Sequence, residues 1–171
     1  KRIFTVQTDN RQVKTTPIVH HVPEDGSLRP YATEYRCAYP GDDHVEEHRL
    51  VAIDSESGKV QAANYRRIPV NRYGYGLFVD QLAWWNKDHR HAYFVETERG
   101  GQIARVVEFD TYTGYTRILL EETSKTYIKF SPIETTPAIL LPLPESDELI
   151  WYSERSGWAH IYLYDLTNGA L

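Results

Sequence analysis

The sequence predicts an all-β chain, a partial β-propeller of about three four-stranded antiparallel blades. The first observation is a phrase that recurs three times: a short apolar or aromatic strand, an Asp, two variable residues, a small polar residue and a Gly. The second is its spacing, because the Asp residues stand at positions 54, 110 and 165, in steps of 56 and 55 residues. A strand-built repeat of about 40–50 residues is typical of propeller blades. The third is the set of 13 Tyr, 4 Trp and 5 Phe residues, which favours strands.

The three copies are Val51–Gly58, Val107–Gly114 and Tyr162–Gly169. Each predicts a third strand that runs into a tight turn, where Gly supplies a backbone with φ > 0. A second pattern supports this register, since Glu98–Gly101 and Glu154–Gly157 are similar, lie 56 residues apart and each follow a second strand. The repeat therefore predicts equivalent positions in consecutive blades.

The N-terminal third is less regular. We expect strands over Arg2–Thr8, Val13–Val22 and Thr33–Tyr39, then a polar loop from Pro40 to His48, then a hairpin of Arg49–Ile53 and Lys59–Arg66 around Ser57-Gly58.

The next two blades are cleaner. The second has expected strands Asp80–Trp85, His91–Glu98, Ile103–Asp110 and Tyr115–Glu121. The third has Ala138–Leu143, Glu148–Glu154 and His160–Asp165, and its fourth strand would lie beyond Leu171. Gly and Pro residues interrupt every helical period, so no helix is expected.

Composition excludes some classes of function. The net charge of −5 and the lack of a basic run argue against nucleic-acid binding. No stretch approaches the roughly 18 apolar residues of a membrane span, so we expect no membrane contact by this segment. The single Cys37 allows no internal disulfide. His44 and His48 have metal-ligand chemistry, but the Pro40-Gly41 context favours a solvated loop, and we expect neither a metal nor a cofactor.

The last blade resembles a known family. The segment Glu148–Asp165, which reads ELIWYSERSGWAHIYLYD, closely resembles the propeller of the dipeptidyl peptidase IV family, within the prolyl oligopeptidase class of serine peptidases. Arg29-Pro30 with Tyr35–Asp42, Ala92–Arg99 and Glu121–Tyr127 are similar to other parts of that propeller. The resemblance covers nearly the whole chain, and its motifs are specific in combination.

The resemblance implies that residues 1–171 are a fragment of an N-terminal β-propeller that caps a C-terminal α/β-hydrolase domain of the same polypeptide. That domain would supply the Ser, Asp and His that remove N-terminal dipeptides from peptide substrates. No Gly-x-Ser-x-Gly elbow occurs in this chain, so we expect it to hold no catalytic residue and to show no activity alone. The family's double-Glu motif would lie upstream of Lys1, and neither Glu46-Glu47 nor Glu121-Glu122 has its sequence context.

Phe130 and Ser131 are the predicted substrate-binding residues. By resemblance, Phe130-Ser131-Pro132 matches a Phe-Arg-Pro stretch that lines the outer substrate pocket in some dipeptidyl peptidases. Ser131 replaces the Arg of those members, so its charge contact is missing here. The alternative is an ordinary linker between blades.

Other conspicuous residues have structural interpretations. Trp84, Trp85 and Trp151 lie on expected strands, where aromatic side chains pack between blades. Trp158 follows a turn and is a candidate for an exposed position or for a contact between blades. The repeated Glu-Arg pairs at 98–99 and 154–155 predict salt bridges or turn contacts rather than catalysis.

Two functions remain open from the sequence. One is the substrate-gating propeller of a serine dipeptidyl peptidase; the other is a stand-alone β-propeller interaction module that binds protein or glycan. An incomplete ring exposes strand edges, so we expect the isolated chain to self-associate. The resemblance favours a periplasmic or membrane-tethered extracytoplasmic location, with a cytoplasmic one open.

Overall fold

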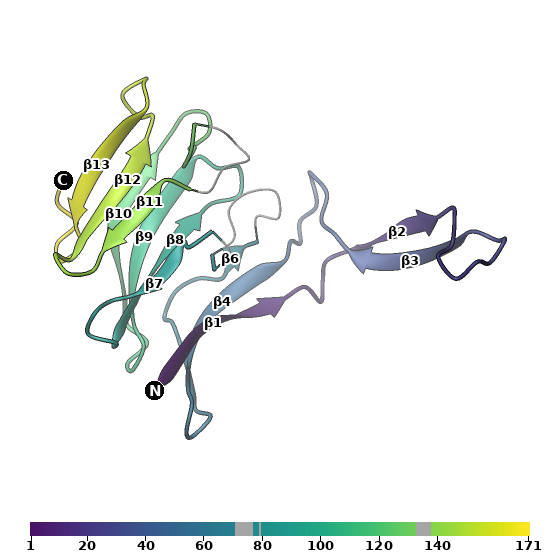
Figure 1. Cartoon of the computed structure of the whole chain (residues 1–171), viewed down its shortest axis with the longest axis horizontal. Helices are drawn as coiled ribbons and strands as arrows, with labels where there is room; N and C mark the ends of the chain where they lie inside the picture. The colour runs from purple at the N-terminus through teal and green to yellow at the C-terminus, as the bar shows by residue number, and fades with distance from the viewer. Residues whose placement is uncertain (71–76, 79, 133–137) are drawn as a thin grey trace.

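Thirteen β-strands and no helix form the described part of the chain, which in this computed structural model comprises residues 1–70, 77–78, 80–132 and 138–171. These strands make four antiparallel sheets (Figure 1). No described segment forms a helix of the length and apolarity needed to cross a bilayer. The predicted all-β fold of a partial propeller is confirmed.

The first blade contains β1 (Arg2–Asp9), β4 (Glu47–Asp54), β5 (Val60–Ala62) and β6 (Ile68–Pro69). β1 and β4 pair along their whole length. β5 and β6 pair with opposite ends of β4 and together take the place of one strand. The predicted strand Lys59–Arg66 is therefore shorter than expected. It ends because the backbone N–H of Asn64 leaves this sheet and donates to the carbonyl of Gly114 in the next blade, at 2.7 Å.

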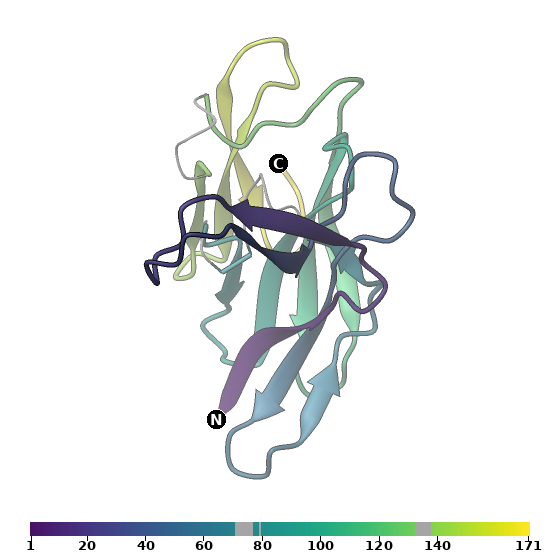
Figure 2. The ribbon, with the colours of Figure 1, turned by 90° about the vertical axis from the view of Figure 1, so that its right-hand side faces the viewer.

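A two-stranded arm interrupts this blade. β2 (Thr15–His20) and β3 (Tyr31–Arg36) pair only with each other among the described strands, between β1 and β4 in the sequence. Figure 1 shows this arm projecting away from the stacked blades, and in Figure 2 it lies in front of them, toward the viewer. All six residues of β3 are exposed. The sequence predicted two strands here, but not that they would leave the propeller as a sheet of their own.

The second blade runs in sequence order through β7 (Ala83–Trp85), β8 (His91–Thr97), β9 (Ile103–Asp110) and β10 (Thr116–Thr123). The third holds β11 (Leu140–Leu143), β12 (Glu148–Ser153) and β13 (His160–Asp165). Both orders match the prediction, and β13 is an edge strand within the described part of the chain.

Two apolar cores lie between the blades. Successive strand residues point to opposite faces, and β8 shows this clearly. Ala92 and Phe94 pack toward the first blade, in a core with Phe4, Leu50 and Phe109. Tyr93 and Val95 pack toward the third blade, in a core with Leu149, Trp151 and Tyr164. Both faces of the second blade are thus covered, which explains the unbroken apolar run from Ala92 to Val95.

The repeated Asp residues occupy equivalent turns. The Asp carbonyl accepts a hydrogen bond from the Gly N–H four residues later, at 2.9 Å in the pairs Asp54–Gly58 and Asp110–Gly114 and at 2.7 Å in Asp165–Gly169. Each carboxylate also accepts backbone N–H donors inside its turn. The three Gly residues have φ of 70°, 85° and 76°. The sequence repeat is therefore a repeat of local hydrogen bonding and backbone conformation.

Candidate functional site

The antiparallel topology gives the blades two distinct ends. The Asp turns lie at one end. The opposite end, called the linker end, gathers the base of the arm (37–46), the β8–β9 turn (98–102), the β12–β13 turn (154–159) and the start of the β10–β11 linker (124–132). The two Glu turns are equivalent there. The N–H of Gly101 donates to the backbone carbonyl of Glu98 at 2.9 Å, and the N–H of Gly157 donates to that of Glu154 at 2.8 Å. Loops from all three blades therefore meet at the linker end.

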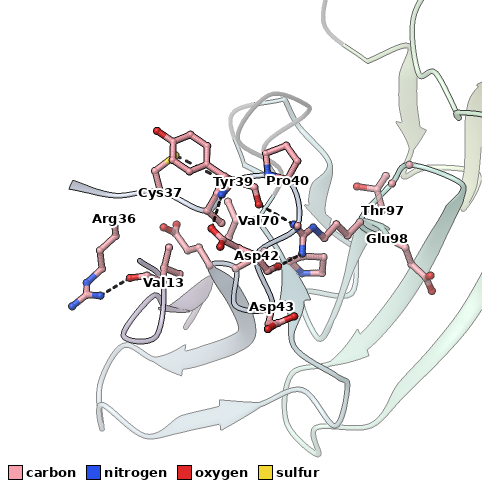
Figure 3. Close-up of a pocket in the computed structure, with 18 of the residues that line it drawn as sticks. Val13, Arg36, Cys37, Tyr39, Pro40, Asp42, Asp43, Val70, Thr97 and Glu98 are labelled. Atoms are coloured by element: carbon pink, nitrogen blue, oxygen red, sulfur yellow. Dashed lines mark hydrogen bonds between the residues drawn. The ribbon is translucent and has the colours of Figure 1, made fainter. Parts of the chain in front are cut away.

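A cavity of about 1020 Å³ opens at this end, between the arm and the second blade (Figure 3). Its walls come from segments far apart in sequence. They are the arm base with Val13 and Arg36, Pro69 at the end of β6 with the following Val70, residues 97–101 at the end of β8 and in the β8–β9 turn, and Tyr127 at the start of the linker. The lining carries a net negative charge, because four carboxylates outnumber two guanidiniums. These residues are Asp42, Asp43, Glu46, Glu98, Arg36 and Arg99.

A tight turn and an arginine shape the arm side of the cavity. Tyr39-Pro40-Gly41-Asp42 is a β-turn in which Asp42 N–H donates to the Tyr39 carbonyl at 3.1 Å. Gly41 has φ 92°, which an L side chain rarely adopts. Arg99 reaches across from the second blade and donates to the carbonyls of Asp42 and Tyr39, at 2.7 and 3.3 Å. Arg99 thereby ties the arm base to the β8–β9 turn.

Asp42 is fixed inside this turn. Its carboxylate accepts the Lys14 ammonium at 2.7 Å and the Tyr39 backbone N–H at 2.9 Å. These two hydrogen bonds, the Lys14 one first, hold the pKa of Asp42 below its ordinary value. Asp42 thus stays ionised, and each of its carboxylate oxygens accepts one of these hydrogen bonds.

The linker begins at the cavity wall. The Tyr127 ring lies so close to Gly101 that a Cβ there would be 2.3 Å from a ring carbon. The next residue, Ile128, is buried and donates its N–H to the Gly101 carbonyl at 2.7 Å. The linker therefore leaves the cavity edge and turns inward between the second and third blades.

The predicted substrate residues lie further along this linker. Phe130 and Ser131 are 2% and 1% exposed, at the seam between the second and third blades. The Phe130 ring packs edge-on against Trp151, with centroids 5.4 Å apart. Neither residue lines the cavity, whereas Tyr127 does. Their contact with substrate stays a prediction.

The other conspicuous residues are dispersed. His44 is exposed, and His48 on β4 is half-buried and shares a hydrogen bond with Thr8. Burial lowers the pKa of His48. Across the described ranges, no three His, Cys, Asp or Glu side chains are grouped to hold a metal ion.

Trp151 is fully buried and Trp158 is 78% exposed, in line with the roles predicted for them.

The two repeated Glu-Arg pairs differ in their contacts. Glu98 accepts from Arg66 and Arg105, whereas Arg99 binds the arm. Arg155 stacks on Tyr162, with its guanidinium carbon 3.7 Å from the ring centroid, and donates to the Tyr164 hydroxyl. Both pairs join strands or loops, as predicted, but neither forms a bridge between its own two members.

Sequence reasoning missed two buried carboxylates. Glu96 is 1% exposed, lies at the seam between the first and second blades, and interacts with Tyr65, Arg66 and Arg105. Burial first, and then the hydrogen bond to Glu96, raise the pKa of Tyr65 to about 12. Glu122 is 6% exposed at the second seam, where it bonds to the third blade. The apolar run of β8 and the alternation of β10 indicate buried positions. Only Arg105 is near its partner in sequence, nine residues from Glu96, and the other partners lie about 30 residues away.

With this geometry in place, comparison with known proteins identifies the family. Residues 1–170 match the family described as the dipeptidyl peptidase IV (DPP IV) N-terminal region. The chain belongs to that family. The match covers all three blades and the arm, so the blade repeat, the linker end and its cavity are all features of one DPP IV N-terminal region.

Solved structures agree with this fold. A Bacteroides ovatus protein assigned as a dipeptidyl aminopeptidase IV matches 98% of this chain with a TM-score of 0.69 at 20% identity. Porphyromonas gingivalis dipeptidyl peptidase 4 matches 99% of it with a TM-score of 0.71 at 17% identity. The chain spans 22% of the length of each. At these identities the likeness shows the shared propeller fold.

Proposed function

We propose that this chain is the substrate-gating, N-terminus-recognising propeller portion of a serine dipeptidyl peptidase that removes N-terminal dipeptides. The observation that carries the proposal is the family match over residues 1–170, of a chain whose fold gathers a cavity and a blade linker at one end. The two solved proteins compared above are a dipeptidyl aminopeptidase IV and a dipeptidyl peptidase 4 by name. The catalytic Ser, Asp and His would lie in a C-terminal α/β-hydrolase domain of the same polypeptide.

In this proposal the linker end faces the hydrolase domain and the peptide substrate. Phe130 and Ser131 belong to the segment that approaches the substrate. The neighbouring Tyr127 is 48% exposed and the Lys129 side chain is partly exposed. Burial of Phe130 supports a role in fixing the segment's shape, while Tyr127 and Lys129 offer polar groups outside the seam. No catalytic residue is assigned to this chain.

The experiment compares the full-length parent with the isolated 171-residue chain. A chromogenic glycyl-prolyl anilide reports release of an N-terminal dipeptide. The parent should cleave it through an acyl-enzyme on a Ser outside this chain, and the isolated chain should not. Turnover by the isolated chain that a serine-directed inhibitor blocks would overturn the assignment of catalysis to another domain.

A stand-alone interaction module is the second candidate, and the arm is the observation that favours it. Its strands carry exposed apolar side chains, including Ile18, Val19 and Tyr35, and all of β3 is exposed. Such a surface suits a protein contact. A parent gene that ends soon after this segment, without a nucleophile elbow, would favour this second function over the first.

A further inference from the structure

Two adjacent glutamates at the end of β10 serve opposite faces of the second blade. Glu121 is exposed and bonds through its Oε2 to Arg105 at 2.6 Å, on the face toward the first blade. Glu122 points to the third blade. Its Oε2 accepts the indole N–H of Trp151 at 2.8 Å, and its Oε1 accepts the Ser153 hydroxyl at 2.6 Å.

Glu122 is an unusual choice for a seam between two sheets. It is 6% exposed, and no ion pair found between the described residues includes it. A buried carboxylate without a cation pays a desolvation penalty that neutral hydrogen bonds offset only in part. An apolar pair would pack such a seam at least as stably. The carboxylate therefore points to a positioning role for the groups that it holds.

The first group that it holds is the Trp151 ring, and through it the linker. Trp151 is fully buried, and its ring meets Phe130 edge-on, 5.4 Å between centroids and 89° between planes. The Phe130 carbonyl accepts the Ile139 N–H at 2.7 Å. Together with the hydrogen bond from Ile128 to Gly101, this bond holds the backbone of residues 128–130 at two points, and Trp151 contacts the Phe130 ring.

The second group is the β12–β13 turn. Ser153 donates to Glu122 and accepts the backbone N–H of Arg155 at 3.0 Å. Glu122 therefore connects to two segments of the linker end. It reaches the linker through Trp151 and the 154–157 turn through Ser153. A single carboxylate thus fixes two of the loops that meet there.

We propose that Glu122 is a positioning residue for substrate binding. It orients Trp151, and through that ring it fixes the Phe130-Ser131 linker at the linker end. The inference rests on the proposed function for its substrate, but its structural half, the fixing of the linker, can be tested separately.

The experiment uses the full-length parent and four variants. Glu122→Ala removes both acceptors and should raise KM for the glycyl-prolyl anilide by about tenfold, because small displacements of a positioning segment weaken binding strongly. Its kcat should change by less than about twofold, since the reacting groups lie outside this chain. Glu122→Gln keeps an acceptor for the indole N–H and should largely restore KM. Trp151→Phe keeps a ring against Phe130 without the donor and should raise KM as Glu122→Ala does.

Glu121→Ala is the matched control, since the neighbouring side chain is also a glutamate but faces the other way. It should leave KM unchanged. A second readout needs no activity: trypsin should cleave after Lys129 faster in Glu122→Ala than in the wild type or in Glu121→Ala, because the linker is released. If Glu122→Ala fails to fold, Trp151→Phe takes its place in both assays.

The outcomes separate the two ideas. A folded Glu122→Ala variant with unchanged KM and unchanged tryptic cleavage would overturn the positioning role. Equal changes in Glu121→Ala would overturn it too, because they would indicate general loosening of the blade. A parent that releases no dipeptide at all would refute the proposed function, while the cleavage after Lys129 would still decide whether Glu122 fixes the linker.

Discussion

Gly169 in the third Asp turn faces the backbone carbonyl of Leu119 in the second blade, and a Cβ built on Gly169 would lie 2.0 Å from that oxygen. The equivalent Gly114 faces the first blade in the same way, with the Ala62 carbonyl oxygen 2.7 Å from its ideal Cβ. Gly58 is the third equivalent and has nothing within 4 Å. The repeated Gly therefore serves two purposes, a positive φ within the turn and a close contact with the preceding blade.

These three positions allow strain and contact to be separated. Alanine at any of them meets the left-handed backbone penalty of about 1–2 kcal/mol. Gly169→Ala and Gly114→Ala must also displace a neighbouring backbone, which adds about 1–3 kcal/mol. Urea unfolding of the isolated chain should therefore rank Gly58→Ala as the mildest. Equal losses at all three positions would mean that φ alone explains the repeat.

The contrast also shows why these turns were predictable. Asp, the small polar residue and Gly interact within four residues, so a short stretch of sequence is enough to predict the turn. The contact of Gly169 with Leu119 spans two blades, and no local pattern reports it. The same holds for the arm, because alternation in Val13–Val22 and Thr33–Tyr39 indicates strands but not the sheet that they join.

The candidate site follows the same division. Phe130 and Ser131 were singled out by resemblance, and the sequence placed them correctly in a linker between blades. The Phe130 ring packs against Trp151, which lies 21 residues later in sequence. Arg99 was expected to have a structural role, but its partners in the arm base are 57 and 60 residues away. Distances of this kind are set by tertiary packing.

Trp151 should be essential for stability. It is fully buried in the second core, and its indole N–H is held by Glu122. Trp151→Ala leaves a cavity and an unpaired acceptor, so it should cost about 3–5 kcal/mol and unfold or aggregate the chain. His44→Ala, at an exposed loop position, should leave Tm nearly unchanged. Differential scanning calorimetry of both variants tests this, and similar shifts in Tm would contradict the assignment of core and loop.

Acid should weaken the Asp turns. Hydrogen bonds from the Ser57 backbone and side chain lower the pKa of Asp54 to about 2 from an ordinary value of 3.8. Burial opposes the shift at Asp110, but hydrogen bonds from Arg90 and the turn backbone overcome it and hold that pKa well below its usual range. A carboxyl with a lowered folded-state pKa stabilises the fold above its unfolded pKa. Stability should therefore fall as pH drops from about 4 toward 2.

Asp110→Asn tests this directly. The amide oxygen still accepts the Tyr112 N–H, but the charge that pairs with Arg90 is gone. Stability at pH 7 should fall by about 1 kcal/mol, at the upper end for a partly exposed ion pair. The decline in denaturation midpoint between pH 4 and 2 should also become shallower. An unchanged slope would assign the acid sensitivity to other carboxyls, such as Asp9, whose pKa Arg11 also lowers.

Self-association is expected of the isolated chain because the third blade exposes an apolar face and an edge. Leu141, Ile161 and Leu163 are 54%, 58% and 48% exposed, and β13 pairs only with β12 among the described strands. Unpaired edges and exposed apolar faces both favour association. Size-exclusion chromatography with light scattering should therefore show species larger than the 19.9 kDa monomer, increasing with concentration. Leu163→Lys should shift the population toward monomer.

Val22→Lys is the matched control, because Val22 is an apolar residue 88% exposed outside the blades. Monomer formation by Val22→Lys alone would assign the contact to the arm, and a monomeric wild type at all concentrations would contradict the prediction.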